Sequence, residues 1–96
     1  MYIVTLTYTV GLDRIDQTLP DHMVWLEKGY ASRVFIASGR RSPRVGGVIL
    51  AAPVERSVLE DLLQQDPLAV RGYAEYDVVE FDPTTIASGI VLEHRR

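Results

Sequence analysis

Residues 2–9 read YIVTLTYT, and this stretch decides what kind of fold the chain can form. Large apolar residues alternate along it with smaller, mostly β-branched ones: Tyr2, Val4, Leu6 and Tyr8 on one side, and Ile3, Thr5, Thr7 and Thr9 on the other. A period of two in such residues predicts a β-strand. Because one side is strongly apolar and the other is rich in threonine, we expect an antiparallel or mixed sheet with two unequal faces.

The segment after Gly11 carries apolar residues at helical spacing: Ile15, Leu19, Leu26 and Tyr30, with Met23 beside them. Thr18 and Asp21 resemble a capping box with Pro20 in its first turn, so we predict a helix over residues 19–30. Residues 12–17 form either a short turn before this helix or its first part, kinked at the proline. Gly29 is expected to help end the helix.

The remaining segments continue the pattern of strands and helices. We predict a strand over residues 33–38, a polar loop over 40–45 and a strand over 48–52 that is opened by Gly46 and Gly47. A helix is predicted to start at Pro53 and to end before Pro67. A connection over 68–72 then leads to a strand over 73–81. The order βαββαβ is that of an α+β, ferredoxin-like fold, with a four-stranded antiparallel sheet and two helices on one face.

The open face of such a sheet is partly apolar, and a second copy of the chain would cover it, so we expect a homodimer. The 96 residues are expected to form a single domain, with residues 1–82 as the core. Residues 83–96 form a C-terminal tail, in which Ile90–Leu92 is either an extra strand or an arm.

Composition excludes several classes of protein. The chain has 47% hydrophobic and 24% charged residues, which is typical of a globular domain. It has no cysteine, so disulfides, thiolate zinc sites and cysteine nucleophiles are excluded. A net charge of −3 argues against nucleic-acid binding. Without an apolar run of about 20 residues or a signal peptide, we expect a cytoplasmic protein with no membrane contact.

His22 and Asp66 are the residues best suited to acid–base chemistry. His22 lies at the edge of the apolar stripe of the first helix, and imidazole titrates near neutral pH. It is either a core histidine bonded to a backbone carbonyl or a functional group. Asp66 is either the residue that ends the second helix before Pro67 or a carboxylate that orients the histidine. The sequence leaves both alternatives open.

A basic segment, Ser38–Gly47, joins two predicted strands and carries Arg40, Arg41 and Arg44. It is either a solvated loop or a positive site for a carboxylate or phenolate. Tyr8 and Trp25 are expected to be packing residues. With one histidine in the folded part and no regular spacing of carboxylates, we predict no metal site.

Further segments occur in a characteristic order: LDRID at 12–16, PDH at 20–22, WL at 25–26, SG at 38–39, PRVGGVILA at 43–51, DP at 66–67 and Gly72. On these segments the chain resembles the YciI-like family over nearly its whole length, to about Phe81. The resemblance implies a dimeric α+β barrel, in which the sheets of two ferredoxin-like subunits pack together. Many relatives have proline and phenylalanine where this chain has Arg40 and Leu68, so a relative's substrate is not transferred.

The resemblance also implies that His22 and Asp66 form an active-site dyad, and that Ser38, Gly39 and Arg44 line the substrate pocket. Better understood enzymes of this kind transfer protons in small aromatic-derived compounds, by dehydrochlorination or, on a similar fold, muconolactone isomerisation. We therefore expect an enzyme of the lyase or isomerase type, without cofactor, acting on a small anionic or aromatic-derived compound. The alternatives are a non-catalytic small-molecule-binding domain and an accessory dimeric subunit.

Overall fold

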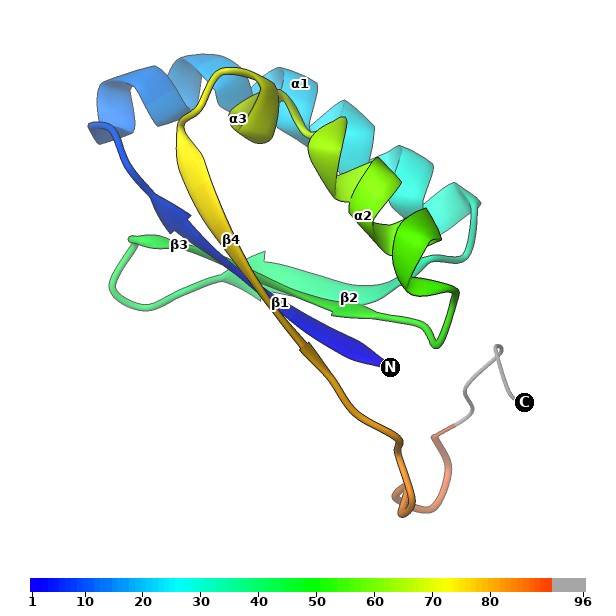
Figure 1. Cartoon of the computed structure of the whole chain (residues 1–96). Coiled ribbons are helices and arrows are strands. Elements are labelled where there is room, and N and C mark those ends of the chain that lie inside the picture. The colour runs from blue at the N-terminus through cyan, green and yellow to red at the C-terminus, as the bar shows by residue number, and fades with distance from the viewer. Residues whose placement is uncertain (91–96) are drawn as a thin grey trace.

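The computed structural model describes residues 1–90 and shows a four-stranded sheet with helices on one face (Figure 1). Its elements are β1 (Tyr2–Tyr8), α1 (Leu12–Ala31), β2 (Phe35–Arg40), β3 (Gly46–Ala51), α2 (Arg56–Gln64), α3 (Pro67–Val70) and β4 (Ala74–Glu80). The strands lie in the order β2-β3-β1-β4, and all neighbours are antiparallel. The predicted ferredoxin-like α+β fold is confirmed.

The alternation in β1 separates the core from the open face of the sheet. Tyr2, Val4 and Leu6 are at most 2% exposed and face the helices, whereas Ile3 on the other face is 39% exposed. The core is completed by apolar side chains of the two long helices: Ile15, Trp25, Leu26, Leu59, Leu62 and Leu63. Trp25 packs as predicted, and its Nε1–H donates to the carbonyl of Leu62 at 2.8 Å.

The first helix is continuous from Leu12 to Ala31, with Pro20 inside it, so the predicted capping box is wrong. Thr18 is fully buried, and its hydroxyl donates to the carbonyl of Arg14 at 3.0 Å instead of capping a helix. The proline lies on the exposed side, where its missing N–H is easily tolerated. Packing of Ile15 against the sheet outweighs the local start signal at Thr18.

Gly29 was predicted to help end the helix, but α1 continues past it to Ala31. The glycine instead allows the helix to approach β2. A Cβ atom at this position would lie 2.1 Å from the ring of Phe35. That ring is buried between Trp25 and Tyr30, with ring centroids 5.2 and 6.0 Å away. The glycine therefore sets the close contact between α1 and β2.

Several boundaries differ from the prediction. β2 begins and ends two residues later than expected, because Arg33 has a positive φ of 61° and belongs to the turn after α1. α2 begins at Arg56 rather than Pro53, and the predicted connection over 68–72 contains the short helix α3. Residues 81–90 hold no helix or strand, and the predicted element at Ile90–Leu92 lies largely outside the described residues.

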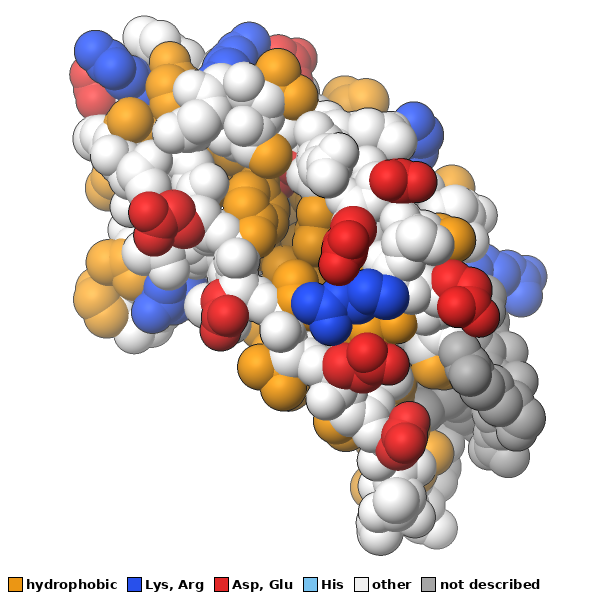
Figure 2. Space-filling view, in the orientation of Figure 1, with side chains coloured by type: hydrophobic (Ala, Val, Ile, Leu, Met, Phe, Trp, Pro, Cys, Tyr) orange, Lys and Arg blue, Asp and Glu red, His pale blue; other side chains and the backbone are white. Residues whose placement is uncertain are grey.

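The β4 side of the molecule is acidic. Glu75, Asp77 and Glu80 are exposed on this edge strand, and Figure 2 shows acidic side chains spread over the face seen there. Charges on an edge strand oppose pairing with other strands. Over residues 1–90, no helix is both long and apolar enough to cross a membrane.

Candidate functional site

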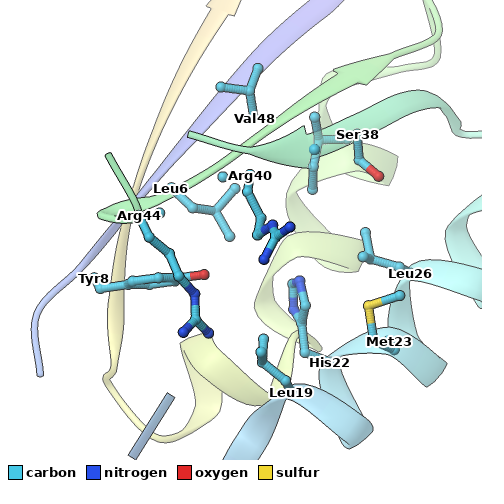
Figure 3. Close-up of a pocket in the computed structure, with 14 residues that line it drawn as sticks. Leu6, Tyr8, Leu19, His22, Met23, Leu26, Ser38, Arg40, Arg44 and Val48 are labelled. Carbon is cyan, nitrogen blue, oxygen red and sulfur yellow. The ribbon is translucent and has the colours of Figure 1, made fainter. Parts of the chain in front are cut away.

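A cavity of about 350 Å³ lies between α1 and the β2–β3 part of the sheet (Figure 3). This is at the small end of the range for ligand pockets, roughly 300–1,000 Å³. Its apolar wall includes Leu6, Leu19, Met23 and Leu26, and its polar wall includes Tyr8, His22, Ser38, Arg40 and Arg44. Four of the predicted site residues, His22, Ser38, Gly39 and Arg44, thus border one cavity, and Asp66 lies buried behind His22.

His22 and Asp66 are in direct contact although 44 residues separate them in the chain. Nδ1 of His22 lies 2.8 Å from Oδ1 of Asp66. The histidine side chain is 12% exposed and the carboxylate is fully buried. The helical register of α1 brings the imidazole over the start of α3, where the carboxylate lies.

Asp66 contacts His22, but it does not end the second helix, because α2 ends at Gln64 with Gln65 as its C-cap. It is the N-cap of α3, and its Oδ1 accepts the backbone N–H of Leu68 at 3.1 Å. Its Oδ2 accepts the hydroxyl of Tyr76 from β4. With His22, three donors surround this buried carboxylate, and such donors offset the cost of removing it from water.

The tautomer of His22 follows from these contacts. An ionised carboxylate only accepts hydrogen bonds, so the shared proton of the neutral ring lies on Nδ1. The lone pair is then on Nε2, which has no hydrogen-bond partner among residues 1–90. Because His22 borders the cavity, Nε2 is the atom available to take a proton from a bound molecule or return one to it.

Tyr76 was not among the predicted site residues, although the alternation in β4 signals that it is buried. Alternation in this strand puts Tyr76 opposite Leu6, on the face that meets the helices. Burial, followed by its hydrogen bond to Asp66, raises the pKa of Tyr76 well above its ordinary value of 10.0. The hydroxyl therefore stays protonated at neutral pH and donates to Asp66.

The three arginines of the basic segment separate onto different faces of the sheet. Arg40 and Arg44 border the cavity, and Figure 3 shows both entering it from the sheet side, opposite His22. Arg41 turns away and donates to the hydroxyl of Thr7 at 2.9 Å, on the open face. The segment is thus only in part a solvated loop.

Comparison with known families agrees with this arrangement. The family model of the YCII-related domain matches residues 1–82. The chain belongs to the YCII-related family. No curated protein matches it. The match covers every helix and strand described above, from β1 to β4, and both members of the His22–Asp66 pair.

Two tyrosines lie at the pocket of this YCII-related chain. The hydroxyls of Ser38 and Tyr30 lie 2.6 Å apart, which ties β2 to the end of α1 beside the cavity. Tyr8 packs against the core, as predicted, and also lines the cavity. Over residues 1–90 no three His, Asp or Glu side chains gather as metal ligands would.

Arg44 is held by an ion pair with Asp16 of α1. The hydrogen bond from Arg44 keeps the pKa of Asp16 below its ordinary value of 3.8, although desolvation acts in the opposite direction. The same bond raises the pKa of Arg44. The pair thus fastens the β2–β3 connection to α1 at the mouth of the cavity.

We expect Asp16→Asn to lower the urea midpoint of unfolding at pH 7 and to have no effect in acid. The folded-state pKa of Asp16 is lowered, so its stabilisation is complete above the ordinary value of 3.8 and is lost as the pH falls through the lowered pKa. Urea unfolding at pH 7 and at successively lower pH values, until the difference between the two proteins no longer changes, measures the effect. Glu27→Gln, on the exposed side of the same helix, is the control; an equal effect of Asp16→Asn at all of these pH values would contradict the assignment.

Proposed function

We propose that this protein is a small-molecule enzyme in which His22 transfers protons and Asp66 orients it, with residues 1–82 as the functional core. The observation that carries the proposal is the 2.8 Å bond from Nδ1 to a buried carboxylate, which leaves Nε2 at the cavity. A carboxylate on Nδ1 fixes the tautomer and the orientation of the ring, so that the lone pair is on Nε2. Such a histidine can remove a proton from a C–H group and return it, as elimination and isomerisation require.

The substrate we propose is a small anionic or aromatic-derived compound, bound by Ser38, Gly39 and Arg44. The cavity supports this because apolar side chains form one wall and basic ones the other. Nε of Arg44 is buried and lacks a hydrogen-bond partner among the described residues. A substrate oxygen would supply the missing acceptor. Proton transfer of this kind needs no organic cofactor.

A screen of phenolic, lactone and chlorinated compounds, with products identified by mass spectrometry, tests the proposal. We expect at least one compound to be converted by the wild type, and conversion to fail in His22→Ala and Asp66→Ala. Unchanged turnover in both folded variants would overturn the dyad. Saturable binding without any product would favour the non-catalytic binding domain instead.

We also propose that two copies associate through the open sheet face, as a cytoplasmic homodimer. Ile3, Val48 and Val79 are 39, 38 and 52% exposed there. Pairing places Ile3 directly opposite Val79, so they form one apolar strip across β1 and β4. Exposed apolar strips of this kind usually meet a second surface. Light scattering measures the mass in solution; a monomer at all concentrations would contradict the proposal.

A further inference from the structure

Arg40 reaches the cavity because β2 contains a β-bulge. Phe35 pairs with Ala51, but Ala37 pairs with the next residue, Leu50, so one extra residue lies between them. Regular alternation from Phe35 would send Arg40 to the open face. The bulge reverses the alternation, so that Arg40 pairs with Gly47 and shares the helix-facing side with Phe35. Bulges commonly redirect a side chain in this way beside functional sites.

The neighbours of Arg40 leave room for it over the cavity. Gly47 of β3 pairs with Leu6 of β1 on one side and with Arg40 of β2 on the other. Because glycine has no side chain, the space between Leu6 and Arg40 stays open for the arginine. Figure 3 shows the guanidinium directed toward the ring of His22, from the opposite wall. Both residues border the same cavity, so an anion bound by Arg40 lies within reach of the imidazole.

The charges around the cavity differ in whether they are already paired. Arg44 is paired with Asp16, and His22 is bonded to Asp66. The side chain of Arg40 has no ion-pair or hydrogen-bond partner among residues 1–90. When His22 is neutral, Arg40 therefore supplies a positive charge in the cavity wall that no residue among 1–90 compensates. Arg44 can still offer its buried Nε–H, as a hydrogen-bond donor rather than as a free charge.

We propose that Arg40 anchors the carboxylate of a monoanionic ligand and so determines the specificity of the site. Guanidinium and carboxylate match in shape and charge, and can form two parallel hydrogen bonds. The apolar body of the ligand would lie against Leu19, Met23 and Leu26 of α1. This inference rests on the proposed function for the location of the ligand, but it concerns binding and not proton transfer.

Benzoate is a suitable probe, because it joins one carboxylate to an apolar ring of a size that suits the cavity. Binding is measured by titration calorimetry and by backbone NMR shifts of residues around the cavity. We expect Arg40→Gln to weaken benzoate binding about tenfold, in keeping with the loss of a hydrogen-bonded charge at a solvent-exposed side chain. Arg14→Gln, which removes the same charge from α1 outside the cavity wall, should leave the affinity within about twofold.

Two further probes examine the charge itself. Benzamide has nearly the same shape without the charge, and should bind more weakly than benzoate to the wild type and equally to wild type and Arg40→Gln. Phthalate carries a second carboxylate and should bind no more tightly than benzoate. Equal benzoate affinity of wild type and Arg40→Gln, tighter binding of phthalate, or absence of saturable benzoate binding to the wild type would each overturn the inference.

The proposed enzyme and the proposed anchor can fail separately. If Arg40→Gln weakens benzoate binding while His22→Asn leaves turnover unchanged, the anchor stands and proton transfer by His22 is wrong. If His22→Asn abolishes turnover while Arg40→Gln binds benzoate like the wild type, the enzyme stands and the anchor is wrong.

Discussion

Asp66→Ala is expected to lower the free energy of unfolding by roughly 3–5 kcal/mol, because it leaves three hydrogen-bond donors without their acceptor in the interior. The carboxylate is fully buried and accepts from the Nδ1–H of His22, the N–H of Leu68 and the hydroxyl of Tyr76. Each donor left unsatisfied in the interior costs about 1–3 kcal/mol, and the cavity created at the start of α3 adds to that. Urea unfolding at one fixed protein concentration measures the loss.

Asp66→Asn keeps the test informative if the alanine variant does not fold. The amide preserves an acceptor oxygen for His22 and Leu68, and its NH₂ can donate to the oxygen of Tyr76. We expect it to lose about 1–2 kcal/mol, less than the alanine variant. Asp61→Ala, an exposed carboxylate on α2, is the control and should change stability by less than about 0.5 kcal/mol. Stability of Asp66→Ala within about 1 kcal/mol of wild type would show that the three donors do not depend on this carboxylate.

His22→Asn is expected to lower turnover by about 10²–10⁴-fold, the usual contribution of a general acid or base. The amide nitrogen of asparagine lies near the place of Nδ1 and can still donate to Asp66. Nothing replaces Nε2 at the cavity, so the variant loses the proton-transferring atom and keeps the structural bond. We therefore expect its stability to remain within about 1 kcal/mol of the wild type.

Two measurements on one variant separate catalysis from structure. The ratio kcat/KM on a substrate found in the screen reports proton transfer, and urea unfolding reports the bond to Asp66. Glu27→Gln, on the exposed side of α1, serves as the control for both. Full turnover in a folded His22→Asn protein would exclude His22 as the acid or base.

The sequence predicted the strands and helices well, because their signals are local. The alternation in β1 and the apolar stripe from Ile15 to Leu26 depend on periods of 2 and 3.6 residues, which backbone geometry imposes. The errors arose where a local signal competed with packing. Thr18 resembled a helix cap but is buried inside α1, and Gly29 resembled a helix end but accommodates the ring of Phe35.

The candidate site was only partly predictable. His22, Ser38, Gly39 and Arg44 were expected around one pocket and border one cavity, and Asp66 was expected beside His22. Their roles in function remain our proposal. Tyr76 was not predicted, because its role depends on the contact between β4 and the start of α3. Arg40 was named only as one of three arginines in the basic segment, because the bulge in β2 decides that it faces the cavity.

The sequence by itself determined the order of the elements, the face of each strand that becomes buried, and the absence of thiol chemistry. Each depends on composition or on neighbours within a few residues. Only the tertiary structure decided which distant groups meet: Asp66 lies under His22 across 44 residues, and the one-residue bulge turns Arg40 inward. Hydrogen bonds require positions accurate to a few tenths of an ångström, and that accuracy arises from the packing of the whole core.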